Sequence, residues 1–300
     1  MVTKLLELTV PENVCMWILD FLTNRKQLVR IDDAMSSTCS INTGAPQGCV
    51  LSPVLFILYT NSFVSTQIGC DVFKYADDTV ILGKITDSEE SNYRQEIANA
   101  VTWCENHHLV LNASKTKELV IDTRNRPTCI YPSFVGDTAV EIVSKYKYLG
   151  TLIDNKLKWI DNTDALCKKG SQRMYFLRKL KHFNVDRTIL NLFYTSVVQS
   201  VVTFSSVCWY NNISVGNKVK LERVRKAAER IIGKDLDSFE CLYNRNVLKK
   251  FNIIMKTDHP LRCQVQWLKS GRRIQSIMCK TNRFRDSFLP TAIRLFNKCG

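Results

Sequence analysis

Two runs of strand-forming residues flank a pair of adjacent aspartates in the segment 73–82, which reads Phe-Lys-Tyr-Ala-Asp-Asp-Thr-Val-Ile-Leu. β-Branched and aromatic residues on both sides of a short polar turn predict a β-hairpin. Aspartate suits the turn because its short side chain bonds nearby backbone and tolerates unusual dihedral angles. The hairpin therefore brings the carboxylates of Asp77 and Asp78 to one tip.

Two carboxylates at one tip repel each other unless a cation lies between them. Divalent ions such as Mg²⁺ prefer carboxylate oxygens, so Asp77 and Asp78 are candidate metal ligands. The alternative interpretation is a solvated turn with no bound ion. The tetrapeptide alone does not decide between the two, so the flanking sequence matters.

A second constrained segment, Asn-Thr-Gly-Ala-Pro-Gln-Gly-Cys-Val-Leu-Ser-Pro, occupies residues 42–53. Gly44, Pro46 and Gly48 predict a turn with few side chains, which lets backbone approach a base pair closely. Ser52 followed by Pro53 predicts a helix start, with serine as the N-cap and a helix over 53–66. The buried face of that helix is expected to hold Val54, Leu55, Leu58 and Tyr59.

In this order and spacing, the two segments resemble motifs B and C of reverse transcriptases, in particular those of vertebrate non-LTR retrotransposons of the LINE type. Residues 111–118 (Leu-Asn-Ala-Ser-Lys-Thr-Lys-Glu) resemble motif D, and residues 147–153 (Lys-Tyr-Leu-Gly-Thr-Leu-Ile) resemble motif E. The resemblance covers essentially the whole chain. It implies an α+β fold with a polymerase-type palm, an antiparallel sheet with packed helices, followed by an all-helical basic thumb and a C-terminal tail.

The resemblance also implies roles for individual residues. Asp77 and Asp78 would hold Mg²⁺ for two-metal nucleotidyl transfer, and Lys115 would protonate the departing pyrophosphate, with Lys117 as its competitor. The nucleotide and template would contact Pro46, Gln47, Gly48 and Tyr75. The primer grip would consist of Tyr148, Leu149 and Gly150, for which an ordinary hairpin is the alternative. The implied partners are an RNA template, a DNA primer duplex and deoxynucleoside triphosphates, without a membrane; the sequence leaves the oligomeric state unknown.

The family's palm carries a further metal-binding aspartate in motif A, within a Leu-x-x-Asp-Phe-Ser-x-Ala-Phe-like string. No such string occurs here, and the segment 15–25 resembles sequence just downstream of motif A. Asp20 lies in an amphipathic run and Asp32 and Asp33 in a turn, so all three are interpreted as solvated surface residues. We therefore expect a truncated or domesticated polymerase fragment that begins after motif A and is inactive alone.

Charge is divided unevenly along the chain. Residues 1–155 contain 13 Lys and Arg against 18 Asp and Glu, whereas residues 156–300 contain 29 against 10. A basic half beside a catalytic half is the electrostatics expected of a thumb that grips nucleic acid through its phosphates. The candidate phosphate-binding residues lie in one predicted helix and are Arg223, Arg225, Lys226 and Arg230. A lysine-rich solvated surface is the alternative.

The change from strand-like to basic helical sequence near 156–161 sets the predicted domains: a partial palm at 1–158, a thumb at 159–235 and a basic extension at 236–300. Helices are predicted over 13–22, 89–108, 166–180, 187–202, 219–232 and 288–296. Strands are predicted over 27–31, 118–122 and 139–143, with hairpin segments at 71–82 and 145–153. His107 and His108 would close the second of these helices by meeting its last carbonyl groups.

The 12 cysteines are scattered singly without a Cys-x-x-Cys pair, which argues against zinc ligation and a secreted disulfide framework. Free, mostly buried thiols in a reducing compartment are expected. Since neither a signal segment nor an apolar run of membrane-spanning length is evident, a nuclear or cytoplasmic location is predicted.

Two other functions are considered. The first is a nucleic-acid-binding remnant that uses the basic thumb without chemistry. The second follows from a similarity of the segment 162–173 to sequence labelled as the N-terminal part of an AlkB-type tRNA-modifying dioxygenase and methyltransferase. That chemistry needs a His-x-Asp pair for iron and 2-oxoglutarate, and none of the four histidines begins one.

Overall fold

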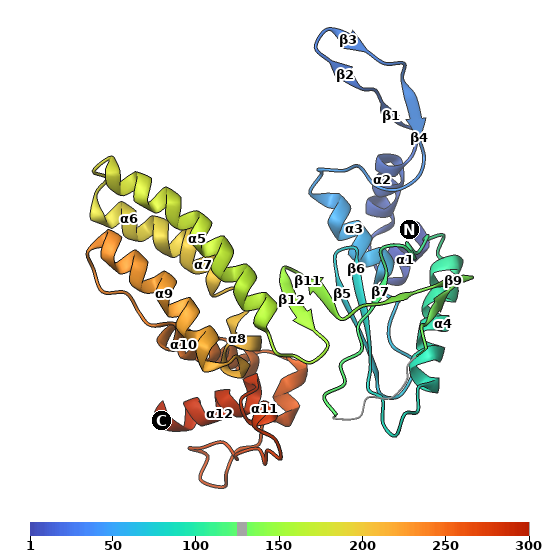
Figure 1. Ribbon diagram of the computed structural model, residues 1–300. Helices are drawn as coiled ribbons and strands as arrows, with labels where there is room; N and C mark the ends of the chain where they lie inside the picture. The colour runs from blue at the N-terminus through green and yellow to red at the C-terminus, as the bar shows by residue number, and fades with distance from the viewer. Residues whose placement is uncertain (125–130, 300) are drawn as a thin grey trace. The chain divides into compact units, whose positions relative to one another are not determined.

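The computed structural model describes residues 1–124 and 131–299, and the chain folds into two compact units. Unit 1 comprises Met1–Glu118 with Thr128–Glu141, and unit 2 comprises Leu119–Pro127 with Ile142–Gly300. Each unit is described separately below. Figure 1 labels the helices and strands.

Unit 1 combines short helices with two-stranded β-structures (Figure 1). Its helices are α1 (Val2–Glu7), α2 (Glu12–Leu22), α3 (Leu51–Thr60) and α4 (Ser91–Asn106). Its first strands are β1 (Arg25–Gln27), β2 (Arg30–Ile31), β3 (Ala34–Met35), β4 (Cys39–Ile41), β5 (Cys70–Tyr75) and β6 (Asp78–Gly83). The later strands are β7 (Lys117–Glu118), β8 (Phe134–Val135) and β9 (Thr138–Ala139), and β10 (Glu141–Ile142) lies at the boundary between the units.

The strands of the described residues pair only in twos: β1 with β4, β2 with β3, β5 with β6, β7 with β10, β8 with β9, and β11 (Lys145–Tyr148) with β12 (Thr151–Asp154). The prediction of a mixed α+β fold is confirmed, but the continuous antiparallel palm sheet that was expected is present only as separate two-stranded pieces. The strands β7 to β10 are two residues long, which is too short to extend a ladder across several neighbours.

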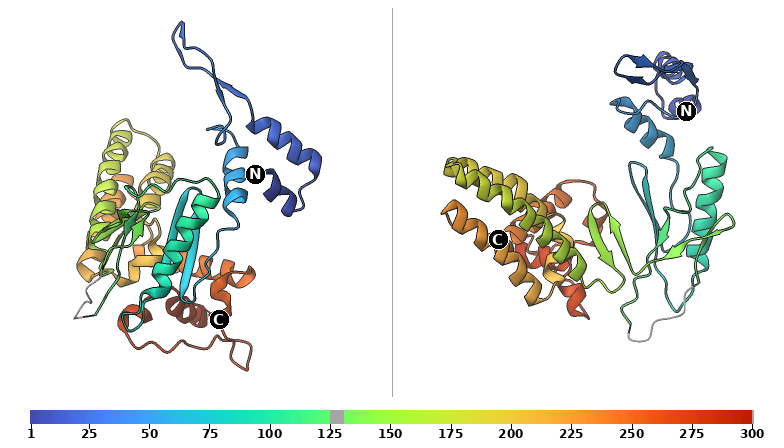
Figure 2. Two further views of the ribbon diagram at one scale, coloured as in Figure 1. Left: turned by 90° about the vertical axis from the view of Figure 1, so that its right-hand side faces the viewer. Right: turned by 45° about the horizontal axis from the view of Figure 1, so that its top comes forward.

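The core of unit 1 is small. Helices α1, α2 and α3 bury a cluster formed by Leu5, Cys15, Ile18 and Leu55. The apolar spacing of residues 13–22 predicts Val14, Trp17, Ile18 and Phe21 on one side of this helix. That prediction is wrong in part, because Trp17 is 59% exposed and only stacks on Phe21 at 5.9 Å between ring centroids. Helix α4 runs alongside the β5–β6 hairpin in both views of Figure 2, as the prediction of a helix against the strands requires.

Unit 2 is a helical bundle preceded by the β11–β12 hairpin (Figure 1). Its helices are α5 (Ile160–His182), α6 (Arg187–Phe193), a π-helical turn (Tyr194–Gln199), α7 (Ser200–Val202), α8 (Ser206–Trp209), α9 (Val215–Ile232), α10 (Phe239–Lys256), α11 (Asn282–Arg285) and α12 (Phe288–Cys299). Short 3₁₀ turns occupy Tyr210–Asn212 and Pro260–Gln264. Side-chain caps begin four of the α-helices, where Asp186, Ser214, Ser238 and Thr281 accept hydrogen bonds from backbone N–H groups.

Two apolar clusters hold unit 2 together. The first surrounds Trp209 and includes Val202, Leu221, Val247 and Phe251. The second lies between α5, α6 and α9 and is formed by Met174, Leu177, Leu190, Tyr194, Val198, Val224, Ala228 and Ile232. The division between the units falls at residues 141–142, ahead of the predicted palm–thumb boundary, because the β11–β12 hairpin packs against the helices of unit 2. The three predicted domains stay a prediction.

One helical stretch among the described residues, Arg187–Asn212, has the length and a mean hydropathy of 1.3 that a membrane span would need. It contributes Leu190, Tyr194 and Val198 to the second cluster, and each of these side chains is fully buried. Part of the stretch therefore lies in the core of unit 2.

Candidate active site

The β5–β6 hairpin forms as predicted. Antiparallel pairing runs from Cys70 opposite Gly83 to Tyr75 opposite Asp78, so Ala76 and Asp77 alone make the turn. Ala76 has a φ of +53°, in the left-handed region that two-residue hairpin turns require. Asp77 and Asp78 are exposed and project from the same tip, and Tyr75 beside them is 64% exposed.

A lysine that the sequence analysis did not single out holds this hairpin in place. The Lys74 Nζ group donates hydrogen bonds to the carbonyl oxygens of Thr60 at 2.8 Å, Asn61 at 3.3 Å and Phe63 at 2.8 Å. These carbonyls close the C-terminal end of α3, where an ammonium also meets the negative end of the helix dipole. Partial burial lowers the pKa of Lys74. The catalytic-type hairpin is thus bonded to the motif B helix.

A second ammonium reaches the same helix end. The Lys4 Nζ group donates to the Tyr59 carbonyl at 2.6 Å and to the Ser62 hydroxyl at 2.9 Å. It also lies 4.7 Å from the ring centroid of Tyr59 and 5.1 Å from that of Trp103, within the range of cation–π contacts. Burial lowers the pKa of Lys4. Two cations therefore fix the end of α3 from which the chain runs toward the hairpin.

We expect replacement of Lys74 by methionine to destabilise unit 1 by about 1–2 kcal/mol, because it leaves three helix-end carbonyls without their ammonium donor. Methionine keeps the apolar stem, so the loss reports the bonds rather than packing. Chemical denaturation of the wild type and the variant measures the change. Lys84→Met is the matched control, since Lys84 lies in the exposed segment just after β6. Equal losses in both variants would contradict the assignment.

The other end of the hairpin packs against α4. A Cβ atom added to Gly83 would lie 2.6 Å from the Tyr93 ring, so the strand and the helix approach each other through a position without a side chain. The Glu96 carboxylate of α4 is fully buried, and its Oε2 accepts hydrogen bonds from the backbone N–H groups of Thr66 and Gln67, both at 2.9 Å. These contacts fix the loop that leads into β5.

The motif B turn has the open backbone that its sequence predicts. Gly44 and Gly48 have φ values of +67° and +79°, and nothing lies within 4 Å of a Cβ atom added to either. Gln47 and Gly48 are exposed and Pro46 is half-buried. The Arg25 guanidinium donates to the Thr43 carbonyl at 2.5 Å and to the Gly44 carbonyl at 3.0 Å, which anchors the start of the turn.

The predicted start of the motif B helix is wrong. The helix begins at Leu51, with Val50 as its N-cap residue, and it ends at Thr60 rather than near residue 66. The Ser52 hydroxyl does not cap the helix because it donates to the Pro46 carbonyl at 2.6 Å and so closes the turn instead. Val54 is 49% exposed, and Leu55 alone among the four predicted inward residues is fully buried.

The two motif D lysines differ in their surroundings. Lys117 donates to the Ser114 carbonyl at 3.0 Å and forms an ion pair with Glu141 at 2.7 Å. Lys115 is exposed at a turn closed by Asn112, whose side-chain oxygen accepts a hydrogen bond from the Lys115 backbone N–H at 3.1 Å. The structure thus commits the Lys117 ammonium to neighbouring groups and presents Lys115 to solvent.

The predicted primer-grip residues form the turn of the β11–β12 hairpin. Tyr148 pairs with Thr151, and Leu149 and Gly150 have φ values of +44° and +87°. A Cβ atom added to Gly150 would lie 3.3 Å from the Phe204 ring, so the turn packs against this ring within unit 2. Leu149 is 37% exposed.

Three of the four predicted phosphate-binding residues share one exposed face of α9. Arg223, Lys226 and Arg230 are exposed and follow helical spacing. Arg225 lies elsewhere: its side chain is 13% exposed, pairs with Glu222 at 2.5 Å and with Glu229, and donates to the Leu236 carbonyl at 2.9 Å. These neighbours neutralise Arg225, so its guanidinium holds the α9–α10 connection together.

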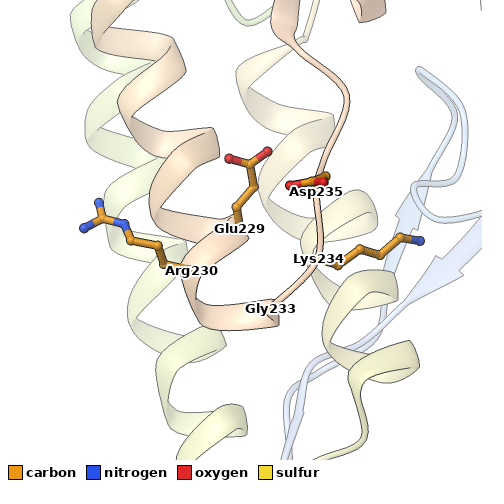
Figure 3. A pocket seen from close by; sticks show the side chains of 5 residues that line it. All are labelled: Glu229, Arg230, Gly233, Lys234 and Asp235. Atoms are coloured by element: carbon orange, nitrogen blue, oxygen red, sulfur yellow. The ribbon is translucent and has the colours of Figure 1, made fainter.

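A shallow hollow lies at the C-terminal end of α9 (Figure 3) and is lined by Glu229, Arg230, Gly233, Lys234 and Asp235. Figure 3 shows the Arg230 and Lys234 side chains pointing away from each other. Two acids and two bases at its rim give the hollow no net charge, and its shape favours no ligand class.

The expectation of mostly buried cysteines is wrong. Of the ten described thiols, three are buried, at Cys15, Cys70 and Cys104, and four are exposed, at Cys39, Cys208, Cys241 and Cys263. The spacing of the cysteines does not report their exposure, since Cys39 lies in β4, Cys208 in α8, Cys241 in the first turn of α10 and Cys263 in a 3₁₀ turn. Cys129 and the side chain of Cys299 lie outside what the structure describes. The Cys49 Sγ atom lies 3.2 Å from the Ser52 Oγ atom, and this hydrogen bond lowers the pKa of the Cys49 thiol.

The hairpin carboxylates do not form a full metal site with other described residues. Across residues 1–124 and 131–299, no three His, Cys, Asp or Glu side chains lie together as a metal-binding group. Mg²⁺ is usually bound through one or two carboxylates, with waters and substrate phosphates as its remaining ligands. Asp77 and Asp78 would supply two carboxylates at this tip, and the further aspartate that the resemblance to reverse transcriptases implies has no counterpart grouped with them among the described residues.

Comparisons with known proteins connect these segments to one family. Residues 2–153 match the family described as reverse transcriptase (RNA-dependent DNA polymerase). Residues 159–200, which cover α5 and the start of the next helical stretch, match the family described as alkylated DNA repair protein alkB homolog 8, N-terminal.

The chain is 26% identical over 248 residues to the RNA-directed DNA polymerase from mobile element jockey of Drosophila melanogaster, an alignment that covers 76% of this chain and 26% of that protein. It is 25% identical over 169 residues to the probable RNA-directed DNA polymerase from transposon BS of the same organism, covering 53% and 19%. A jockey polymerase of Drosophila funebris is 30% identical over 149 residues, covering 47% and 16%.

The chain thus spans about a fifth of the length of these relatives, which come from Drosophila mobile elements rather than vertebrate ones. The family match includes the motif B turn, the Asp77–Asp78 hairpin and the motif D and E segments, and it covers half of the chain. The chain belongs to the reverse transcriptase (RNA-dependent DNA polymerase) family.

Proposed function

We propose that this chain is a reverse-transcriptase domain of a non-LTR retrotransposon that binds an RNA template and a DNA primer and does not extend the primer unaided. The observation that carries the proposal is the hairpin tip, where Asp77 and Asp78 are exposed on a hairpin bonded through Lys74 to the motif B helix. Family membership supports the same function, and the named relatives are RNA-directed DNA polymerases.

In the proposed arrangement, Asp77 and Asp78 are metal ligands and Lys115 is the proton donor. Pro46, Gln47, Gly48 and Tyr75 would border the nucleotide and template, and the turn of Tyr148, Leu149 and Gly150 would contact the primer. The exposed face of α9 would bind phosphates through Arg223, Lys226 and Arg230, while Arg225 stabilises the fold. The proposed palm, thumb and basic extension correspond to residues 1–158, 159–235 and 236–300.

The missing motif A aspartate supports the proposal that the chain does not catalyse extension unaided. When bound, Mg²⁺ would supply charge neutralisation for phosphoryl transfer. The resemblance to reverse transcriptases implies a further aspartate ligand beside Asp77 and Asp78, and no group of three such side chains lies together among the described residues. A non-catalytic role in binding nucleic acid is therefore the second candidate, and the excess of 29 basic over 10 acidic residues in 156–300 favours it.

The match of residues 159–200 to an AlkB-related family does not lead us to propose oxygenase chemistry. His182 is the one histidine within that match, and Phe183 and Asn184 follow it instead of the x-Asp of an iron-binding pair. The matched residues form α5, α6 and the π-helical turn that build the core of unit 2.

Primer extension tests the proposal. The purified chain is given a labelled DNA primer on an RNA template, Mg²⁺ and all four deoxynucleoside triphosphates, and binding is measured at several salt concentrations. We expect salt-dependent binding without extension. If the wild-type chain extends the primer and the Asp77→Asn variant does not, the proposed inactivity is refuted and the role of the Asp77 carboxylate in catalysis is confirmed. Absence of any binding would overturn the function itself. Asp137→Asn, at an exposed turn after β8, is the control substitution.

A further inference from the structure

Helix α5 carries aromatic side chains on its outer surface. Tyr175 is 52% exposed, Phe176 is 57% exposed, and Phe183 just beyond the helix is 73% exposed. Aromatic rings are usually buried, and three exposed rings within nine residues need an explanation. The inward face of the same helix is well packed, since Leu166, Met174 and Leu177 lie in the two clusters of unit 2.

The rings share their face with cations. Lys168, Gln172, Tyr175, Phe176, Lys179 and Phe183, named here the α5 strip, follow the four- and three-residue spacing of one helical face. All six are exposed. The Lys179 Nζ atom lies 5.7 Å from the centroid of the Tyr175 ring, and Phe176 meets that ring edge-on at 5.5 Å. Figure 1 shows α5 running beside α9 in the bundle.

The sequence around the α5 strip carries charge of one sign. Between Ala165 and Val185 the sequence holds Lys168, Lys169, Arg173, Arg178, Lys179 and Lys181 and no Asp or Glu. Arg173 is directed inward, because it donates to the Val197 carbonyl at 2.6 Å, whereas the other five are exposed. Lys168 and Lys179 belong to the α5 strip, whereas Lys169, Arg178 and Lys181 lie outside the strip on the same helix. Cations without a nearby acid in the sequence attract a polyanion.

We propose that the α5 strip binds an unpaired nucleic-acid strand, with bases stacked on Tyr175 or Phe176 and on Phe183 and phosphates held by Lys168 and Lys179. Every base has a π-face that stacks on an aromatic ring, whereas the bases of a duplex are already stacked on each other. The two ring positions lie eight residues apart, about 12 Å along the helix, with Lys179 between them. This inference deepens the proposed function by naming a single-stranded partner.

The face of α9 provides the contrast within the same unit. Arg223, Lys226 and Arg230 are exposed there, and the helix carries no aromatic residue. Cations alone bind phosphates of single strands and duplexes alike. Loss of the α9 cations is therefore expected to weaken the binding of single strands and of duplexes. Loss of the α5 rings is expected to weaken the binding of single strands alone.

Binding of two fluorescent probes to the full chain tests the inference: a single-stranded oligouridylate and an RNA–DNA duplex of the same length. We expect Tyr175→Ala with Phe176→Ala to weaken single-strand binding about tenfold or more, the effect of a lost stacking platform, while duplex binding stays within twofold. Tyr175→Trp should retain single-strand affinity, because indole also stacks. Circular dichroism verifies folding, which these exposed substitutions should preserve.

The outcomes separate this inference from the proposed function. Equal loss for both probes, or no loss for either, overturns the stacking role while nucleic-acid binding by the chain stands. Failure of the wild-type chain to bind either probe overturns both. Vesicles of anionic phospholipid are the third probe. The proposal would be refuted if the chain bound these vesicles tightly, if that binding required Tyr175 and Phe176, and if loss of the two rings left single-strand binding unchanged. That result would show that the rings enter a membrane surface.

Discussion

Replacement of Asp154 by alanine is expected to destabilise unit 2 by about 2–4 kcal/mol, because three backbone N–H groups lose a charged acceptor. The Asp154 Oδ1 atom accepts hydrogen bonds from the N–H groups of Lys156 and Lys158, both at 3.0 Å, and Oδ2 accepts from that of Trp159 at 2.8 Å. One carboxylate thus organises the whole connection between β12 and α5.

The backbone of this connection has strained dihedral angles, and the hydrogen bonds to the Asp154 carboxylate hold it in that conformation. Leu157 and Trp159 have φ values of +50° and +62°, a region that residues with a Cβ atom rarely adopt. The Trp159 side chain is 8% exposed and lies in the cluster around Trp209. Releasing the loop therefore removes a core residue as well as three hydrogen bonds. We expect thermal unfolding about 5–15 °C lower than in the wild type.

The effect has a defined pH dependence. Burial by itself raises the pKa of Asp154, but the hydrogen bonds from the backbone amides outweigh it and lower the pKa below its ordinary value. A carboxylate with a lowered folded pKa stabilises fully above its unfolded pKa of about 3.9 and loses this contribution as the pH falls through the folded value. The difference between the wild type and Asp154→Ala should therefore be constant near neutrality and shrink below about pH 4.

Asp161→Ala serves as the control. Asp161 is exposed and pairs with Lys145 at 3.4 Å, an arrangement that contributes at most about 1 kcal/mol. A loss for Asp154→Ala no larger than that of Asp161→Ala, measured by urea denaturation at pH 7, would show that the loop does not depend on the carboxylate.

The parts of the fold that sequence predicts well are those fixed by local chemistry. The Asp77–Asp78 hairpin forms in its predicted place because strand-forming runs flank a tight turn, although Ala76 and Asp77 make that turn and Asp78 begins β6. The helices of unit 2 between residues 160 and 256 follow apolar spacing that no proline interrupts. Helix α10 carried the same signal, with Ser238 as its cap and Phe239, Leu242, Tyr243 and Val247 inward, and the prediction overlooked it.

The errors come from contacts between segments distant in sequence. The local sequence predicts that Ser52 caps the helix, but its hydroxyl donates to the Pro46 carbonyl and closes the preceding turn. No local pattern distinguishes these two hydrogen bonds. Lys74 reads as a polar residue in a strand, but its bonds to the end of α3 depend on how the hairpin packs. Arg225 shares a helix with four exposed cations, and only the positions of Glu222 and Glu229 make it a structural residue. The sequence therefore predicts the hairpin that carries Asp77 and Asp78. It does not predict the hydrogen-bond and ion-pair partners of Ser52, Lys74 and Arg225.

Replacement of Gly170 by alanine is expected to destabilise unit 2 by about 1–3 kcal/mol, as overpacking does in a filled core. An added Cβ atom would lie 2.9 Å from Val202 Cγ1 and 3.4 Å from Val224 Cγ1, so α5 meets its neighbours through this residue. Val202 is fully buried and Val224 nearly so. The sign of this change in stability is informative, because alanine in place of glycine ordinarily stabilises a helix by up to about 1 kcal/mol.

A second glycine gives the opposite expectation and so tests the cause. Gly216 lies in the first turn of α9, and the nearest atom to an added Cβ is the Ser214 hydroxyl oxygen at 3.9 Å. Gly216→Ala should therefore leave stability unchanged or raise it by a few tenths of a kcal/mol. Combining Gly170→Ala with Val202→Ala should cost less than the sum of the two single changes, because the smaller side chain makes room for the new methyl group. Additive losses in urea denaturation would mean that the helices do not meet at Gly170, and that the packing which holds the α5 strip on the surface rests on other contacts.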